Sequence, residues 1–186
     1  MIKFVVIALA MVVVSCSDPP PPSNSSLPFA QAMKKTGPLP PSNSPLPFAQ
    51  AMKETGSIEI FSLLADTRKS QYDRPSMHGW PILGKTTLSK TASRNTIVSA
   101  FLQDVSPTGP DTELPRCFSP RHAIRVTYLN KTLDLVICFE CRQVKFYQDG
   151  QSDTFTLFEV GRSPEDLFDS VLREAKVPLS REYEGK

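Results

Sequence analysis

The sequence predicts an α+β domain of two layers, in which an antiparallel meander of four to five strands carries two helices on one face. Short runs in which apolar and polar residues alternate indicate strands with one buried face. Two longer runs repeat their apolar residues at helical spacing, which indicates helices with one buried stripe. Asp149-Gly150, between two of the short runs, is a strong hairpin signal because both residues tolerate positive φ.

The expected elements follow one another along the chain in a simple order. The strand-like runs cover residues 58–64, 122–129, 132–147 and 151–158. The first helix is expected over 94–105 with Ser93 as its N-cap, and the second begins with Ser163 as N-cap and Pro164 in the first helical position. The buried stripes are Ile97, Val98, Phe101, Leu102 and Val105 in the first helix and Leu167, Phe168, Val171, Leu172 and Ala175 in the second.

Residues 57–186 are numerous enough to form one domain with its own core. They carry 17 Lys and Arg against 17 Asp and Glu, while the whole chain has a formal net charge of +2. Nucleic-acid binding requires clustered cations that neutralise phosphates, and no such cluster stands out in the sequence. The charge pattern therefore argues against a nucleic-acid partner.

The first residues of the chain have the pattern of an export signal. Lys3 precedes an uninterrupted apolar run over 4–14, which would make about 16 Å of helix at ~1.5 Å per residue. A membrane span needs roughly 20 apolar residues, so the run is too short to cross a bilayer permanently. An ordinary signal peptide cleaved near Ser15 and an uncleaved anchor are the alternatives to the interpretation that follows.

The four residues Val13-Val14-Ser15-Cys16 resemble the lipobox of bacterial lipoproteins, in which the cysteine receives diacylglycerol before the signal is cleaved. The resemblance covers residues 1–16 only and departs from the commonest form by having Val13 instead of Leu. It implies that residues 1–15 are removed and that Cys16, carrying palmitate-type acyl chains, tethers the protein to a membrane of the cell envelope. Ser17, where Asp would be the retention signal in enteric bacteria, favours the outer membrane, with the domain extracytoplasmic.

Residues 16–56 are expected to form a disordered, proline-rich tether. Ten of the 18 prolines lie in this segment, so its backbone is biased towards extended polyproline II. It contains a tandem repeat with a period of 19, since residues 21–37 and 40–56 differ only at Ser26 against Pro45 and Lys35 against Glu54. At ~3.1 Å per residue such a tether could reach on the order of 120 Å.

Two interpretations of this repeat stay open. It could be a spacer that was lengthened by duplication, or a duplicated docking peptide of sequence LPFAQAMK. In the second case Phe29 and Met33, like Phe48 and Met52, would share one face of a short helix formed on a protein partner. Two copies would then bind a partner with two sites by avidity.

Residues 79–86 read GWPILGKT and match the phosphate-loop pattern GxxxxGK[ST]. That loop wraps backbone N–H groups around phosphates at the start of a helix, after a buried strand. Pro81 removes one donor, Trp80 crowds the loop, and neither the strand before nor the helix after is indicated. We therefore predict no nucleotide site, and a strand or hairpin with Trp80 packed in the core.

Three cysteines of the domain are candidates for redox or structural chemistry. Cys138 and Cys141 form a CxxC motif, but an extended chain would hold their Cα atoms roughly 10 Å apart, too far for a disulfide. The two can pair only if the chain bulges or turns between them. In the oxidising envelope we expect Cys117 to pair with one of them, Cys141 or else Cys138. Cys141 is preferred because it is in phase with the apolar residues of the predicted core face, Leu133, Leu135, Ile137 and Phe139.

A structural zinc site is the alternative use of the same cysteines. Cys117, His122, Cys138 and Cys141 have the spacing Cx4Hx15CxxC and supply four ligands suited to a closed tetrahedral site. The glycine that usually shapes a zinc knuckle is absent. The main expectation is that the domain binds no metal and no cofactor.

The sequence therefore predicts a noncatalytic lipoprotein of the cell envelope, with its domain acting as a structural or binding module. No catalytic triad or pair of carboxylates is recognisable, so no catalytic residue is assigned. The alternative is an extracytoplasmic thiol-redox or zinc-binding protein that uses the CxxC region. The strings HGWPILGKT, CFSPRHAIRV and LDLVICFEC resemble those of uncharacterised exported bacterial proteins, which implies no particular activity.

Overall fold

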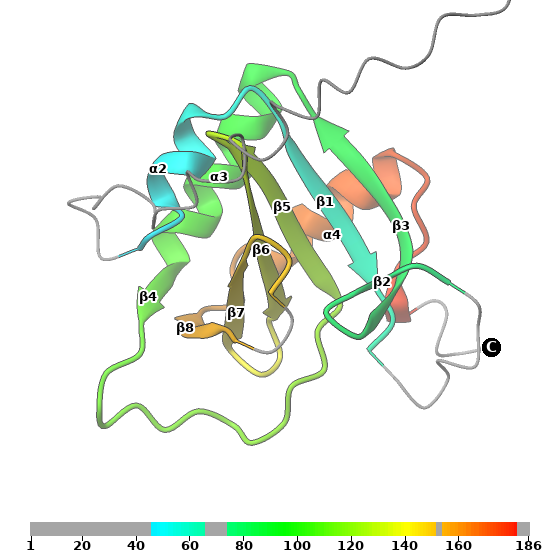
Figure 1. Ribbon diagram of the computed structural model, residues 1–186. Coiled ribbons are helices and arrows are strands. Elements are labelled where there is room, and N and C mark those ends of the chain that lie inside the picture. The colour runs from blue at the N-terminus through cyan, green and yellow to red at the C-terminus, as the bar shows by residue number, and fades with distance from the viewer. Residues whose placement is uncertain (1–45, 66–73, 152–153, 182–186) are drawn as a thin grey trace, which may run out of the picture. The chain divides into compact units, whose positions relative to one another are not determined.

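Eight strands and three helices make up the described part of the chain, residues 46–65, 74–151 and 154–181 of a computed structural model. Neighbouring strands are antiparallel, and their order across the sheet is β2-β3-β1-β5-β6-β7-β8-β4 (Figure 1). The strands are β1 (Ile58–Leu63), β2 (Ser76–Met77), β3 (Trp80–Leu88), β4 (Val105–Pro107), β5 (His122–Tyr128), β6 (Lys131–Cys138), β7 (Gln143–Gln148) and β8 (Thr156–Val160). The helices are α2 (Ala49–Glu54), α3 (Thr91–Asp104) and α4 (Glu165–Glu174).

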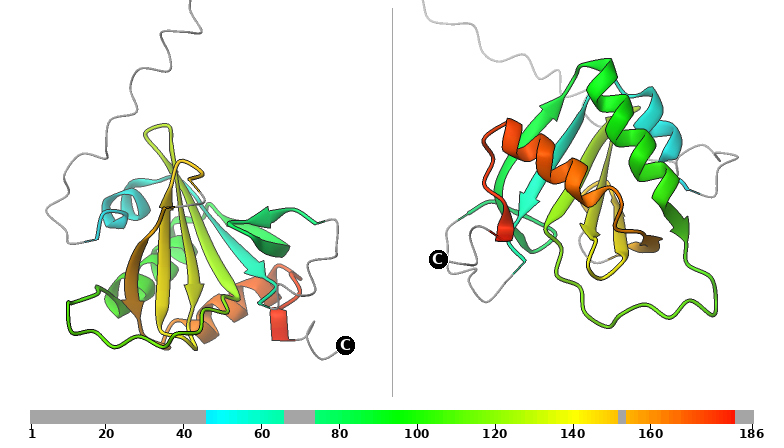
Figure 2. Two further views of the ribbon diagram at one scale, coloured as in Figure 1. Left: turned by 60° about the horizontal axis from the view of Figure 1, so that its bottom comes forward. Right: turned by 180° about the vertical axis from the view of Figure 1, so that it is seen from behind.

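The main core lies between one face of the sheet and the helices, and Figure 2 shows α3 and α4 together across that face. Phe48, Phe101 and Phe168, beside or within the three helices, are fully buried there. The sheet contributes alternate residues, as the pleat requires. These are Ile58 and Ile60 from β1, Ile124 and Val126 from β5, Leu133, Leu135 and Ile137 from β6, and Val144 and Phe146 from β7.

The predicted α+β class with an antiparallel sheet is confirmed, but the predicted number of strands is wrong. The sheet has eight strands instead of four to five. The expected single run over 132–147 is divided into β6 and β7 by a turn. The two-residue β2 and the three-residue β4 are too short to show an alternating pattern, so sequence periodicity had no means of finding them.

The third helix comes from the segment that was expected to be tether. Phe48 and Met52 have no exposed surface, and Ala49 and Ala51 are buried beside them. The Phe48 ring centroid lies 5.4 Å from that of Phe146, 5.1 Å from that of Phe158 and 6.2 Å from that of Phe101. The side chains four residues apart do share one helix face, as predicted, but that face packs on the domain itself.

This packing corrects the predicted boundary between tether and domain at residue 57. Residues 46–56 belong to the domain, because Leu46 is also buried in the main core and Thr55 Oγ1 contacts the carbonyl oxygen of Thr127 at 3.1 Å. The high proline content of residues 16–56 hid this in the sequence, because it concealed a short helix with one apolar face that follows Pro47. The rest of the expected tether, including the first copy of the repeat, lies outside the described residues.

The two predicted helices are present, but neither has the predicted N-cap. Helix α3 begins earlier, after Lys90 instead of Ser93, and α4 follows Pro164; neither cap residue makes a side-chain capping hydrogen bond. Ile97, Phe101, Phe168 and other predicted stripe residues are nevertheless buried. Tertiary burial of the apolar stripe therefore determines these helices more than their caps do. Of the helices in the described part of the chain, none has the length and apolar character needed to cross a membrane.

The hairpin between β5 and β6 offers a test of local strain. Its two turn residues, Leu129 and Asn130, have φ of 49° and 60°, and Leu129 is 63% exposed. Asparagine adopts positive φ with less strain than leucine, so we expect Leu129→Asn to raise the free energy of unfolding by about 0.5–1 kcal/mol. Urea denaturation measures the change. Leu129→Ala removes the same exposed apolar group without relieving the backbone, and an equal gain in that control would contradict the prediction.

The other face of the sheet carries a smaller apolar cluster of Phe61, Leu63, Met77, Ala123, Val136 and Tyr147, against which Trp80 packs. Strand β3 contains most of the GxxxxGK[ST] match, so these residues form a strand in a hairpin with β2, as predicted, and not a loop before a helix. Gly84 has a packing role there: a Cβ at this position would lie 2.8 Å from Cγ1 of Val177.

Candidate cysteine site

The hairpin turn between β6 and β7 brings the CxxC cysteines together. β6 ends at Cys138 and β7 starts at Gln143, and Arg142 adopts a φ of 54° in the turn, where its N–H donates to the Phe139 carbonyl oxygen at 3.2 Å. The turn reduces the separation of the Cys138 and Cys141 Cα atoms to 5.1 Å, and the two cysteines form a disulfide. The condition stated from the sequence, a turn inside the motif, is met.

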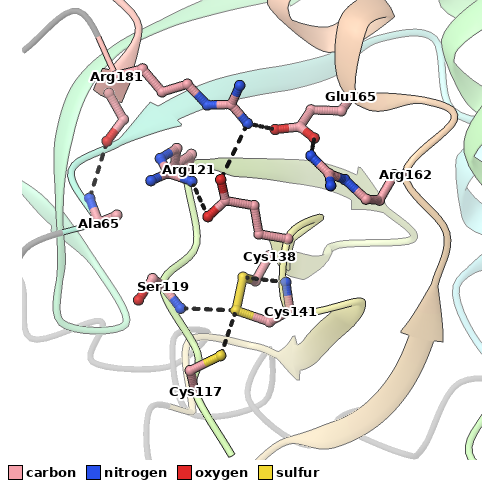
Figure 3. Close-up of polar contacts among 11 residues, drawn as sticks. Ala65, Cys117, Ser119, Arg121, Cys138, Cys141, Arg162, Glu165 and Arg181 are labelled. Atoms are coloured by element: carbon pink, nitrogen blue, oxygen red, sulfur yellow. Dashed lines mark hydrogen bonds and ion pairs between the residues drawn. A yellow bond between two sulfur atoms is a disulfide. The ribbon is translucent and has the colours of Figure 1, made fainter. Parts of the chain in front are cut away.

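The third cysteine lies beside this disulfide but is not part of it (Figure 3). Cys117 belongs to the loop between β4 and β5, is exposed, and has its Sγ atom 3.6 Å from Sγ of Cys141. The predicted bridge from Cys117 to Cys141 or Cys138 is therefore corrected to Cys138–Cys141 with a free thiol at Cys117. The preference for Cys141 assumed that the strand continues through residue 141. Cys141 lies in the turn instead, where side chains no longer alternate between the two faces of the sheet.

Several hydrogen bonds hold the Cys117 loop and the turn against each other. The Ser119 N–H donates to Sγ of Cys141 at 3.4 Å, and the Cys141 N–H donates to Sγ of Cys138 at 3.1 Å. The Gln143 side-chain amide donates to the carbonyl oxygens of Pro115 and Cys117. These contacts, made by residues before and after Cys117 in the chain, keep its Sγ atom close to Sγ of Cys141.

A network of charged side chains borders the disulfide. Glu140, in the turn, accepts from Arg121 at 2.7 Å and is 3.5 Å from Arg181. Arg181 also pairs with Glu165 (Figure 3). The hydrogen bond from Arg121 holds the pKa of Glu140 below its ordinary value, with further help from the charges of Arg181 and Arg162. The network connects the turn to the N-terminal end of α4 and to the end of the described chain, so it fixes the position of the turn.

His122, the fourth residue of the alternative zinc set, is bonded elsewhere. Its Nε2 atom lies 2.9 Å from Oδ1 of Asp169, and its ring packs against Phe139 and Phe168 in the main core. Burial raises the pKa of Asp169, but the bond from His122 and the nearby arginines outweigh this and lower it overall. Within residues 46–65, 74–151 and 154–181 no group of three or more His, Cys, Asp or Glu is placed to hold a metal ion.

The opposite face of the sheet holds a buried charged group that sequence reasoning missed. Asp134, only 1% exposed, accepts from Arg125 Nε at 2.7 Å and Nη2 at 2.8 Å, and its Oδ2 lies 2.8 Å from His78 Nε2. The His78 ring stacks on Tyr147 with centroids 3.7 Å apart. His78 had no obvious partner in the sequence. The one available signal was a single carboxylate, Asp134, among the apolar residues 133–138 of β6.

The fold and the site define a class: an antiparallel α+β domain in which a disulfide closes a hairpin turn next to a free thiol. No protein-family model matches the chain, and no curated protein or solved structure shows significant similarity to it. The functional argument therefore depends on the residues of this chain. The predicted lipidation residue, Cys16, lies outside the described residues.

Proposed function

We propose that the protein is a lipid-anchored protein of the cell envelope whose extracytoplasmic domain is a noncatalytic binding module. The observation that carries the anchor is the export signal with its lipobox-like end, Val13-Val14-Ser15-Cys16. Residues 17–45 would join the acylated Cys16 to the domain, a reach of about 90 Å if they were extended at ~3.1 Å per residue. The outer membrane is the preferred location, on the evidence of Ser17.

The pairing of the ionisable side chains supports a noncatalytic role. His78 is bonded to Asp134 and His122 to Asp169, and Glu140 and Glu165 are engaged by arginines. A general acid or base must be free to exchange protons with a substrate at a cleft. A bond to aspartate alone would not prevent this, but the His78 and His122 side chains are only 5% and 4% exposed, so neither ring is open to a substrate.

The lipid anchor is tested by metabolic labelling with palmitate. We expect the wild-type protein to incorporate label and to fractionate with membranes, and Cys16→Ala to do neither, because the acyl chains supply the membrane affinity. Cys117→Ala is the matched control and should be labelled like the wild type. Label in the Cys16→Ala protein, or an unchanged distribution between membrane and soluble fractions, would contradict the proposal.

A second candidate function, thiol–disulfide exchange, is favoured by the distance of 3.6 Å between the sulfurs of Cys117 and Cys141. In such an exchange the Cys117 thiolate attacks Sγ of Cys141. A Cys117–Cys141 bond forms, the Cys138–Cys141 bond breaks, and Cys138 leaves as a thiolate. The step is an isomerisation, so it consumes no external oxidant or reductant.

Thiol counting and trapping test this candidate. In the Cys16→Ala protein we expect one reactive thiol per folded chain, and none when Cys117→Ser is added, because Cys138 and Cys141 are bridged. A Cys138→Ser variant should form a Cys117–Cys141 bridge on mild oxidation, as read by peptide mapping. Failure of that bridge to form in a folded Cys138→Ser protein would rule out exchange between the two sulfurs.

A further inference from the structure

The site that seats α2 has the properties of a peptide-binding site. The segment in it, residues 46–55, is a short helix with flanking residues, and contacts the sheet and α3 mainly through buried Phe48 and Met52. Phenylalanines of α3, β7 and β8 surround the Phe48 ring. Gln50, Lys53 and Glu54 are exposed, so the site contacts the segment mainly through its buried face, with one further contact from Tyr128 to Glu54.

The chain contains a second copy of the segment that occupies this site. Residues 27–34 and 46–53 have the same sequence, LPFAQAMK, and both copies continue to a Thr-Gly pair. Every buried residue of the seated copy recurs nineteen positions earlier. The buried residues Leu46, Phe48, Ala49, Ala51, Met52 and Thr55 correspond to Leu27, Phe29, Ala30, Ala32, Met33 and Thr36.

We propose that this site binds either copy of the repeat, and that residues 27–36 of the same molecule exchange with residues 46–55 in it. Side chains that are identical at all buried positions present the same apolar surface to the same pocket, so the apolar contacts do not distinguish the first copy from the second. The duplicated peptide therefore docks on its own domain, in place of the two-site partner that the repeat alone suggested.

Two features favour the second copy in this competition. Tyr128 donates its hydroxyl hydrogen to Glu54, and Gln50 donates to the same carboxylate at 3.1 Å; the first copy has Lys35 there, which accepts no hydrogen bond. The second copy also continues directly into β1, whereas docking of the first copy would close residues 37–56 into a loop at an entropic cost. The first copy is therefore the minor occupant.

Exchange would change the length of chain between the anchor and the domain. With the second copy seated, residues 17–45 separate Cys16 from the docked segment, and with the first copy seated only residues 17–26 do so. The difference of nineteen residues corresponds to about 60 Å of extended chain at ~3.1 Å per residue. This consequence rests on the proposed lipid anchor, whereas the exchange itself does not.

Photo-crosslinking of the full chain with Cys16→Ala tests the exchange without depending on lipidation. Methionine is replaced biosynthetically by its small diazirine analogue, which fits the space of the native side chain. We expect crosslinks from Met52 to peptides of the domain core and a smaller set from Met33 to the same peptides. Mixing diazirine-containing chains with chains of a different isotope content distinguishes crosslinks within one molecule from those between molecules. Finding no Met33 crosslinks to the domain core, or finding them only between molecules, would overturn the proposal.

Two matched variants shift the competition in a predictable direction. Lys35→Glu gives the first copy the missing acceptor, and Glu54→Lys removes it from the second. Each of these two substitutions alters one hydrogen bond, that between Tyr128 and the carboxylate, in favour of the first copy. Each should therefore raise the ratio of Met33 to Met52 crosslinks by roughly two- to tenfold. Lys34→Glu changes the charge one position away and corresponds to exposed Lys53, so it should leave the ratio unchanged. An equal response in all three variants would overturn the proposal.

Stability measurements provide an independent reading. We expect Phe29→Ala alone to leave the urea midpoint of the full chain unchanged, and Phe48→Ala to lower it. In the double variant Phe29→Ala/Phe48→Ala the decrease in urea midpoint should be about twice that of Phe48→Ala alone, because the first copy can no longer replace the second. Identical midpoints for Phe48→Ala and the double variant would show that the first copy does not occupy the site. Should both fail to fold, the crosslink ratios of the Lys35 and Glu54 variants still decide.

Discussion

Replacing Phe101 by alanine will lower the free energy of unfolding by about 3–5 kcal/mol, a large part of the stability of a domain of this size. The Phe101 side chain is fully buried in α3, and its ring lies 6.2 Å from those of Phe48 and Phe168. The substitution leaves a cavity where α2, α3 and α4 meet. Urea denaturation followed by circular dichroism gives the change directly.

The matched control for this prediction is Phe155→Ala. Phe155 is 47% exposed and lies outside the main core, so the same truncation should cost less than about 1 kcal/mol. A small effect of Phe101→Ala would mean that the three helices do not pack on the sheet as described. It would also remove the basis for the peptide-binding site, of which Phe101 is one wall.

Removing the buried carboxylate of Asp134 will have the second largest effect, about 2–4 kcal/mol at neutral pH. In Asp134→Ala the His78 ring and the Arg125 guanidinium lose their acceptor on the sheet face. The expected cost stays below that of a fully buried pair, since the Arg125 side chain is 35% exposed and water can solvate it. Asp111→Ala, in an exposed loop, is the control and should change stability by less than about 0.5 kcal/mol.

The pH dependence of this effect has a definite sign. Burial raises the pKa of Asp134, but the hydrogen bonds from Arg125 and His78 outweigh burial and lower the pKa below its ordinary value. A carboxylate with a depressed pKa stabilises the fold above the unfolded-state pKa of about 3.9, and this contribution is lost as pH falls through the lower folded-state pKa. The stability difference between wild type and Asp134→Ala should therefore be largest near neutral pH and shrink below about pH 4. A difference that grows on acidification would contradict the assignment.

Elements with a clear local period could be predicted from the sequence. Strands β1 and β5 lie within one residue of their predicted ends, and the Asp149-Gly150 turn follows β7 with Asp149 at φ 54° and Gly150 at φ 72°. Helix α3 buries its predicted stripe except for half-buried Leu102. Helix α4 buries Phe168 and Leu172, whereas the other three predicted residues are half-buried or exposed: Leu167, Val171 and Ala175. These features depend on residues close in the chain, whose spacing alone sets which face is apolar.

The cysteine site could be predicted only in part. The sequence identified the members of the site, Cys117, Cys138 and Cys141. It also indicated correctly that Cys138 and Cys141 can form a disulfide only if the chain turns between them. The pairing itself was wrong, because it depends on a left-handed residue, Arg142, that carries no strong turn signal. The proximity of Cys117 depends on a loop that is separated from Cys141 by 24 positions along the chain.

By itself the sequence determined the α+β class, the faces of most regular elements and the repeat, and it carries the pattern on which the proposed lipid anchor at Cys16 is based. Only the tertiary structure decided that the second repeat copy belongs to the core, that Cys138 pairs with Cys141, and that His78 and His122 are bonded to Asp134 and Asp169. The physical reason is that periodicity reports which side of an element is apolar, whereas partners across the sheet are selected by which surfaces meet when the chain is compact. A helix as short as α2 is not stable in isolation, and its existence depends on the pocket that receives Phe48.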